Sequence, residues 1–296
     1  MGIGLSCSDY TWPKLSHEAV MKVVSSLGFN AVDIGVFHNQ THVTVSAILS
    51  DAVLEANRVL EIAEYEDLAI ADVFLTAGVT LEELSPTSVT SGDWIKLQEI
   101  FACLLEFAKV VGVNGVTLLP GVVEPGVHPA KAFELSVDRL NVLTGIAAKQ
   151  DLLVSVEPHV GSLIEDPAST LKLLESCPGL SLTLDPSHFG YLGFTVADIL
   201  PLISRTRHVQ IRPAGLGVMQ TRFCDNQLDL DLLIAELVRS NYSGWVASEY
   251  VWMEKWGCDR VDNTTESFFL RSYLQKQLLK NYQTVTKQHD YPLRGS

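Results

Sequence analysis

The amino-acid sequence predicts an α/β protein with the (β/α)8 barrel architecture, in which eight parallel strands alternate with helices. Eight short apolar runs alternate along the chain with longer amphipathic segments, a pattern typical of parallel strands covered by helices. The chain has 296 residues, enough for a barrel that requires about 250. A doubly wound sheet is the competing fold, but the first apolar run lacks the glycine-rich turn that such a sheet places there. We therefore prefer the barrel.

The predicted strands are short runs rich in Val, Ile, Leu and Ala, bounded by turn residues. Apolar runs of about four to eight residues with such boundaries are typical of buried strands. In chain order the eight predicted strands are residues 3–7, 31–37, 68–75, 115–120, 152–157, 180–185, 208–212 and 245–250.

The segments between these strands carry helical periodicity and helix boundary signals. Ser16 is suited to cap the N-terminus of the first helix, and Gly28 follows its last apolar positions. The segment 93–112 begins with an acid and ends with a glycine in the same way. Segments 129–150 and 166–176 continue the pattern, so helices are expected to cover the sheet.

The chain is predicted to form one barrel domain over residues 1–282, followed by a flexible C-terminal tail over residues 283–296. No Pro/Gly-rich linker divides the sequence, and the last ten residues, KQHDYPLRGS, are polar. Segments 213–228 and 251–265 carry little helical pattern. In a barrel they are loops at the C-terminal ends of the strands, where active sites are built.

The composition restricts the partners of the protein. Its formal net charge is −14, from 35 acidic and 21 basic residues, which repels nucleic-acid phosphates and anionic membranes. We expect a small-molecule substrate and neither nucleic acid nor membrane as a partner; the sequence leaves a homo-oligomer open. The five scattered cysteines form no C-x-x-C pair, and no secretory signal is visible. A cytoplasmic location is therefore expected.

Three of the predicted strands end in an acid that faces the barrel interior. Side chains alternate along a strand, and this alternation makes Glu157, Asp185 and Glu249 the last inward residues of their strands. Gln210 is inward on the strand between the last two. The four positions follow one another at spacings of about one strand–helix unit. They are therefore predicted to meet at the C-terminal end of the barrel.

Such a cluster predicts a metal site. Carboxylates brought together in a partly dry cavity repel one another by several kcal/mol per close pair, so they bind protons or a cation. A divalent ion held by oxygen ligands is the simplest solution; Mn²⁺ is preferred, with Mg²⁺ or Co²⁺ as alternatives. The competing interpretation makes the acids helix caps or rim residues paired with arginine, and Asp185 before Pro186 suits a turn.

Four further residues are predicted to contact the substrate. His159 and His188 follow two of the strand-end acids in the loops above the site. Arg212 is the next inward residue after the strand-seven glutamine and is placed to bind an oxyanion, while Trp12 follows the first strand and offers a ring for sugar stacking. Each also has a structural interpretation, as an ordinary loop residue, an ion-pair partner or a packing residue.

Four short motifs give the chain a resemblance to a known superfamily. They are VEPH, LDPSH, HVQIR and SEY, at predicted strands five to eight. Together they resemble the xylose isomerase-like TIM barrels, the sugar phosphate isomerase/epimerase family, over roughly residues 3–280. The resemblance implies metal ligands at Glu157, Asp185 and Glu249, and a substrate-side histidine at His188. Gln210 is a departure, because epimerases of this family usually have histidine there, whereas some dehydratases have glutamine.

The first hypothesis is a divalent-metal-dependent isomerase or epimerase of a keto-sugar or related polyol. The ion would bind adjacent substrate oxygens and favour an enediolate, with Glu157 and Glu249 as the catalytic proton donor and acceptor. The alternative is a carbon–oxygen lyase of the inosose or 3-dehydroshikimate dehydratase type, which shares the first step. A third hypothesis is a carbohydrate-binding barrel without catalysis.

Overall fold

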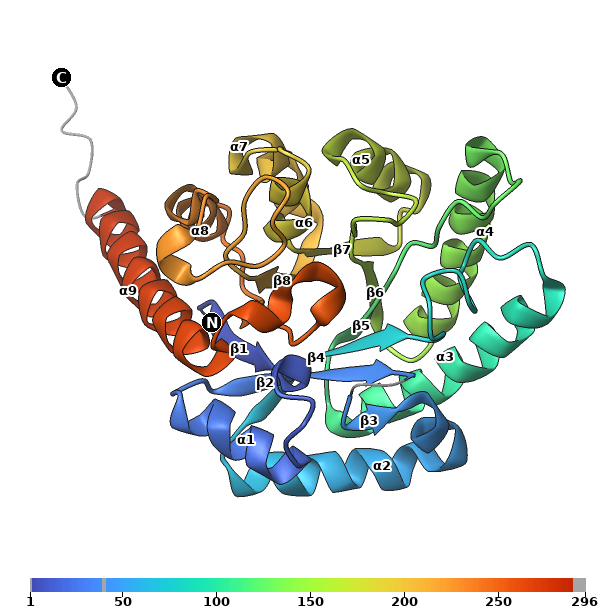
Figure 1. Cartoon of the computed structure of the whole chain (residues 1–296), viewed down its shortest axis with the longest axis horizontal. Helices are drawn as coiled ribbons and strands as arrows, with labels where there is room; N and C mark the ends of the chain where they lie inside the picture. Colours follow the sequence, from blue (N-terminus) through green and yellow to red (C-terminus); the bar gives the residue numbers. More distant parts are fainter. Residues whose placement is uncertain (1, 39–40, 290–296) are drawn as a thin grey trace.

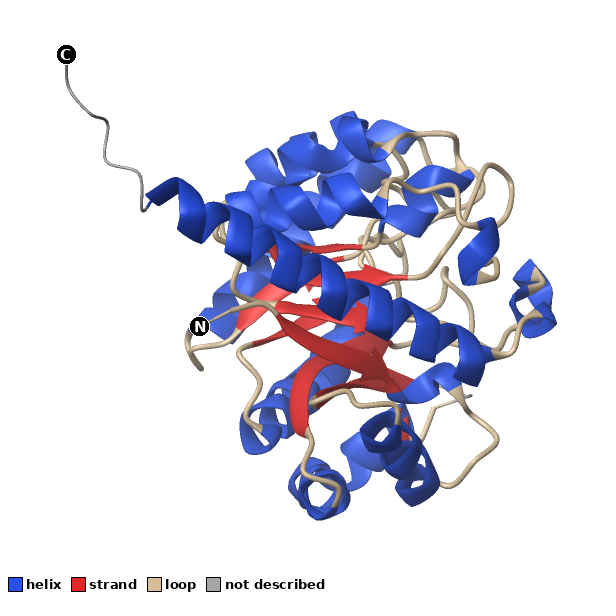
Figure 2. Cartoon of the chain, turned by 90° about the vertical axis from the view of Figure 1, so that its left-hand side faces the viewer, coloured by secondary structure: helices blue, strands red, loops and turns tan. Residues whose placement is uncertain are grey.

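The computed structural model of the chain describes residues 2–38 and 41–289. Its strands form one parallel sheet in the order β1-β9-β8-β7-β6-β5-β4-β2-β3, and a further pairing of β1 with β2 closes eight of them into a barrel. The short strand β3 adds to the edge of β2. Figure 2 shows the strands enclosed by helices. The predicted (β/α)8 barrel is confirmed.

All eight predicted strands are present. The strands are β1 (Gly4–Ser8), β2 (Ala31–Phe37), β3 (Val43–Thr44), β4 (Ala69–Thr76), β5 (Gly115–Leu118), β6 (Leu153–Val156), β7 (Leu180–Leu184), β8 (Thr206–Ile211) and β9 (Trp245–Ser248). The sequence did not predict β3. Several of the observed strands stop one or two residues before the predicted end, so the acids stand immediately after the last strand residue.

The helices follow one another around the barrel in chain order (Figure 1). They are α1 (His17–Ser26), α2 (Val45–Tyr65), α3 (Ser91–Val111), α4 (Pro129–Ala148), α5 (Pro167–Ser176), α6 (Pro186–Tyr191), α7 (Val196–Ile199), α8 (Leu230–Arg239) and α9 (Asn263–His289). The four predicted helical segments correspond to α1, α3, α4 and α5. The predicted tail overlaps the end of α9, and its last residues, 290–296, lie outside the described residues.

Two of the predicted helix boundary signals have the expected structure, one at the N-terminus of α1 and one at the C-terminus of α3. Ser16 caps α1, because its hydroxyl accepts a hydrogen bond from the Ala19 amide at 3.3 Å. Gly112 follows α3 in the left-handed conformation with φ of 81°. Glycine adopts this conformation without the steric cost that a Cβ imposes. The start of α1 and the end of α3 therefore agree with the prediction, whereas α3 begins at Ser91, two residues before the predicted Asp93.

A pair of glycine substitutions tests this boundary. A Cβ at Gly112 or at Gly145 would meet no atom within 4 Å, but Gly145 is exposed inside α4 and has no positive φ. We expect Gly112→Ala to lower the free energy of unfolding by about 1 kcal/mol. The matched Gly145→Ala should raise it by roughly 0.5–1 kcal/mol. Urea denaturation measures the free energy of unfolding of both variants. Changes of the same sign and size in the two variants would contradict the assigned backbone conformations.

The barrel interior is polar, as the alternation of side chains predicts. In β7, Leu182 and Leu184 pack in the hydrophobic core on the helix side. Thr183 points inward, where its hydroxyl lies 2.8 Å from the Ser155 hydroxyl. Deeper in the barrel, His208 Nε2 lies 2.6 Å from Asp33 Oδ2. The interior next to these strands therefore carries a network of polar groups below the strand ends.

The two long loops predicted after the seventh and eighth strands are present. The first contains only the short 3-10 helix η3 (Phe223–Asp225), and the second contains η4 (Glu254–Trp256) and η5 (Cys258–Arg260). Both leave the C-terminal ends of their strands, β8 and β9. Within the described residues, no helix combines the length and apolar character needed to cross a bilayer.

Candidate active site and metal centre

Three carboxylates meet at the C-terminal end of the barrel. Glu157, Asp185 and Glu249 directly follow the last residues of β6, β7 and β9, and none of them is more than 3% exposed. Each residue offers an oxygen within 4.8 Å of the oxygens of the other two. Oxygens on opposite sides of an ion with metal–oxygen distances of about 2.1–2.4 Å lie about 4–5 Å apart. One divalent ion can therefore contact all three.

Gln210 belongs to this cluster through a tyrosine that the sequence did not predict. Its Nε2 donates to the Tyr10 hydroxyl at 3.0 Å, and that hydroxyl donates to Glu249 Oε1 at 2.7 Å. Tyr10 lies in η1 (Asp9–Thr11), immediately after β1. The bond orients the Gln210 amide so that its oxygen is the free end. The only available signal was an aromatic hydroxyl directly after a predicted strand.

Asp185 has structural partners as well as a place in the cluster. Its Oδ1 accepts from the Ser187 amide at 2.8 Å, and its Oδ2 accepts from the Ser187 hydroxyl at 2.7 Å. Asp185 is thus the N-cap of α6, as the competing interpretation predicted. The cap holds its carboxylate at a fixed angle. The two interpretations are therefore compatible for this residue.

Arg212 extends directly into the carboxylate cluster. Its Nη2 lies 3.0 Å from Asp185 Oδ2 and 3.7 Å from Glu249 Oε2, and also 2.9 Å from His188 Nε2. Its Nε donates to the Ser187 hydroxyl at 2.9 Å. Burial alone would lower the pKa of Arg212, but Asp185 and Glu249 outweigh it and raise the pKa. A permanent positive charge therefore lies among the acids.

The two predicted loop histidines lie side by side above the acids. The rings of His159 and His188 are 4.1 Å apart, and His188 Nε2 lies 3.9 Å from Glu157 Oε1. His159 Nδ1 lies 2.6 Å from the Val160 carbonyl oxygen, an acceptor that places the proton on Nδ1 and leaves Nε2 free. Burial lowers the pKa of His159 to about 4 and that of His188 well below its usual value. Burial therefore favours the neutral form of both rings.

Burial at the strand ends favours the protonated forms of Glu157 and Glu249. Burial, followed by repulsion from Glu249 and Asp185, raises the pKa of Glu157 well above its usual value. Burial raises the pKa of Glu249 to about 8, although Arg212 partly opposes the shift. Carboxyls with raised pKa values near neutrality are suited to proton transfer. The electrostatics therefore single out these two residues.

Unpaired oxygens show what the cluster is suited to bind. Within the described residues, three buried oxygens of the cluster have no hydrogen-bond partner: Glu157 Oε1, Gln210 Oε1 and Glu249 Oε2. Buried polar atoms are normally paired. A set of three carboxylates and one amide oxygen matches the preference of hard divalent cations such as Mn²⁺ and Mg²⁺. The residues therefore fit a divalent ion.

A second grouping of possible ligands shares one of these residues. Glu157, His159 and His188 also offer atoms within 4.8 Å of one another. This grouping, however, contains only one of the three unpaired oxygens, Glu157 Oε1. The oxygen-rich grouping is therefore the better candidate for an ion.

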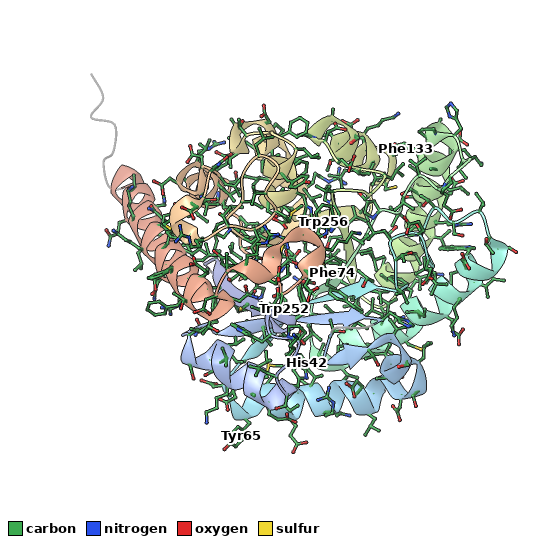
Figure 3. The ribbon with its side chains drawn as sticks, in the orientation of Figure 1. His42, Tyr65, Phe74, Phe133, Trp252 and Trp256 are labelled. Carbon is green, nitrogen blue, oxygen red and sulfur yellow. The ribbon has the colours of Figure 1, made fainter. Side chains whose placement is uncertain are left out.

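The site opens into a cavity of about 570 Å³. Its lining contains Glu157, His159, His188, Arg212 and Glu249 at one end, and Tyr10, Phe37, Phe74, Trp252 and Trp256 among its walls. Figure 3 labels Phe74, Trp252 and Trp256 near the centre of the molecule. The predicted Trp12 does not line this cavity; its indole Nε1 donates to the Thr264 hydroxyl at 3.0 Å. The structure thus brings together all the predicted site residues except Trp12.

A closed barrel of eight parallel strands with polar groups at the C-terminal strand ends defines the class of TIM-barrel proteins whose sites lie at that end. The sequence matches the family described as the xylose isomerase-like TIM barrel over residues 21–273. The chain belongs to this family, and the expected resemblance is confirmed. A search of curated proteins found no match.

Several solved structures share the fold over nearly the whole chain. L-ribulose 3-epimerase has a TM-score of 0.77 at 12% identity, with 99% of this chain and 100% of that chain covered. D-psicose 3-epimerase from Clostridium cellulolyticum H10, solved with D-tagatose, has a TM-score of 0.75 at 12% identity, covering 93% and 99%. The 3-keto-D-glucoside 4-epimerase from E. coli has a TM-score of 0.70 at 15% identity, covering 93% of this chain and 99% of that chain. At such identities the likeness establishes the fold.

Proposed function

We propose that the protein is a divalent-metal-dependent isomerase or epimerase of a keto-sugar or related polyol. The observation that carries this proposal is a pair of buried glutamates, Glu157 and Glu249, each with an unpaired oxygen in one cluster at the strand ends. Membership of the xylose isomerase-like family and the fold shared with ketose 3-epimerases support the same class of reaction. The lyase alternative shares the first chemical step and is separated from it by the experiment below.

The proposed metal ligands are Glu157, Asp185, Gln210 and Glu249. When bound there, Mn²⁺, or alternatively Mg²⁺ or Co²⁺, would act as a Lewis acid that stabilises negative charge on adjacent substrate oxygens. Asp185 is held by the helix cap of α6 and Gln210 by Tyr10. These bonds fix the directions of two of the four ligands before any ion arrives.

Glu157 and Glu249 are the proposed proton carriers. One carboxylate removes the proton from the carbon beside the substrate carbonyl, and the electron pair of the C–H bond moves into an enediolate. The other carboxyl returns a proton to the opposite face of that carbon, which inverts the centre. Tyr10 donates to Glu249 Oε1 and holds this carboxylate in place. A carboxylate has two acceptor oxygens, so one can face the ion while the other takes up the substrate proton.

The substrate would be held by polar groups at one end of the cavity and by aromatic walls at the other. His159 Nε2 is a free acceptor for a substrate hydroxyl. Within the described residues Nη1 of Arg212 has no hydrogen-bond partner, so it can donate to a substrate oxygen, with His188 beside it. Because Trp12 lies outside the cavity, we assign the stacking role predicted for it to Trp252.

The sequence-based proposal of a reducing, cytoplasmic environment has one structural support. All five cysteines are free in the structure. Three of them, Cys7, Cys177 and Cys258, are buried in the fold, and burial raises their pKa values. A protein that keeps unpaired thiols is typical of such a compartment.

Deuterium exchange tests the proposed reaction. The protein is incubated with Mn²⁺ and a panel of keto-sugars and inososes in D₂O, and the products are followed by NMR and ultraviolet absorbance. We expect deuterium at the carbon beside the carbonyl, with formation of the epimer and no loss of water. A new enone absorbance would instead establish the lyase, and no exchange with any compound would contradict both enzymatic hypotheses.

A further inference from the structure

Arg212 occupies a position that its proposed substrate contact does not explain. Only its Nη1 is available to a substrate, whereas Nη2 and Nε are directed at Asp185, His188 and Ser187 within 3.0 Å. The guanidinium is buried and extends from the residue that follows β8. Two of its three nitrogens therefore serve the protein's own cluster.

The guanidinium and a bound ion would share the same carboxylates. Arg212 Nη2 contacts Asp185 Oδ2 and lies 3.7 Å from Glu249 Oε2, which is one of the unpaired oxygens. Two positive charges drawn to the same acids in a buried site repel each other strongly. An ion that binds Asp185 must therefore compete with the guanidinium for that carboxylate.

The charges of the side chains show why the fold tolerates both cations. When all three acids are ionised, as ion binding requires, three carboxylates and one guanidinium leave a surplus of two negative charges, which a divalent ion neutralises. Gln210 adds an oxygen ligand without adding charge. The cluster thus has enough acid to retain Arg212 and still attract an ion, but with less attraction than three unopposed carboxylates would provide.

We propose that Arg212 is a resident counter-cation of the metal site that weakens the binding of the divalent ion and so sets the metal affinity of the protein. This inference rests on the proposed function only in requiring an ion at this site. It assigns to Arg212 a role towards the ion that is separate from any contact with the substrate.

Calorimetric titration of the EDTA-treated and dialysed protein with MnCl₂ at pH 8.5 tests the proposal. The neutral substitutions Arg212→Met and Arg212→Gln remove the charge, and Arg212→Lys keeps it without the planar fork. We expect both neutral variants to bind Mn²⁺ at least tenfold more tightly than the wild type, and Arg212→Lys to stay within about threefold of it. Circular dichroism confirms folding of each variant, and two neutral side chains are used in case one fails to fold.

The outcomes separate the inference from the proposed function. A folded neutral variant that binds Mn²⁺ as the wild type does, or more weakly, overturns the role of Arg212 while leaving the metal site intact. The role of Arg212 is also overturned if Arg212→Lys binds Mn²⁺ as tightly as the neutral variants do, because the positive charge would then not be the cause. If neither the wild type nor any variant binds Mn²⁺ at millimolar concentration, the metal site itself is wrong and the inference falls with it.

Discussion

Replacing Glu249 by glutamine should lower the rate of epimerisation by about 10²–10⁴-fold, the usual contribution of a general acid or base. The amide keeps the size of the side chain and can still accept the hydrogen bond from Tyr10. It removes the ionisable oxygen that takes up the substrate proton. The rate is measured with the best ketose found in the deuterium-exchange panel, at saturating Mn²⁺ and pH 7.5.

Isotope exchange adds a readout that a merely structural effect would not give. If each glutamate serves one face of the substrate carbon, each removes the proton of one epimer only. The Glu249→Gln variant should then still exchange the proton of the epimer served by Glu157 for deuterium, but it should not convert that epimer into the other. Glu157→Gln should show the reverse preference. The matched control is Glu134→Gln, on the surface of α4 beside Lys131, which should keep the wild-type rate. Equal loss of both exchange reactions in both glutamate variants would contradict the division of roles.

The part of the site that the sequence predicts is the part fixed by strand geometry. Alternation along β6, β7 and β9 decides which side chains face inward, and the parallel pairing brings the strand ends to one face. Glu157, Asp185 and Glu249 follow directly from these two rules. Gln210 follows from the same rules, because it is the last inward residue of β8.

The residues placed by irregular backbone were not predictable in this way. Tyr10 and Trp12 both follow β1, in and after a single turn of 3-10 helix, where no period states which side chain faces the cavity. The backbone turns Tyr10 into the cluster and Trp12 towards Thr264 at the start of α9. A choice based on the stacking surface of the ring alone could not show which of the two side chains faces the cavity.

For the Arg212 head group the sequence left two positions open, a contact with a substrate oxyanion or an ion pair with the acids, and it could not decide between them. The alternation predicts that the side chain points inward, but its long flexible stem allows the guanidinium to reach a substrate or a neighbouring strand. The observed direction depends on Asp185 and Ser187, which only the folded structure brings beside it. A metal ion was the simplest predicted partner for the three acids, and the structure adds this internal cation.

In protein from which divalent ions have been removed, we expect the melting temperature to fall as the pH rises from 6.5 to 8.5. Folding raises the pKa of Glu249 from 4.5 to about 8, chiefly through burial, and raises that of Glu157 in the same direction. A carboxyl with a raised folded-state pKa binds its proton more tightly in the folded state. Its stabilising contribution is therefore present at low pH and is lost as the pH rises through the folded-state pKa.

The neighbouring histidines act in the opposite sense and define the lower limit of this pH window. Burial lowers the pKa of His159 from 6.5 to about 4, and that of His188 also falls. Folding therefore favours the neutral forms of both histidines. Below about pH 6.5 this lowers the stability of the folded protein, because the unfolded chain binds protons there that the folded protein does not bind; the effect disappears as the unfolded chain loses these protons near pH 6.5. Above that pH the unfolded chain loses only the remainder of these protons, so the contribution of His159 and His188 changes little. The raised pKa of His208 acts in the same direction as the carboxyls, and the Glu249→Gln variant therefore isolates the part of the slope that belongs to Glu249.

The expected loss is large enough to measure by calorimetry of the EDTA-treated protein. Between pH 6.5 and 8, the contribution of Glu249 to the free energy of unfolding falls by roughly 2 kcal/mol, at about 1.4 kcal/mol per pH unit. In a chain of 296 residues this corresponds to a melting temperature lower by about 3 °C. Glu249→Gln should flatten this slope, and Glu134→Gln should retain it. Because an ion binds only the deprotonated ligands, Mn²⁺ should raise the melting temperature more at pH 8.5 than at pH 6.5. A melting temperature that stays level or rises with pH in the ion-free wild type would show that these carboxyls are already ionised in the fold.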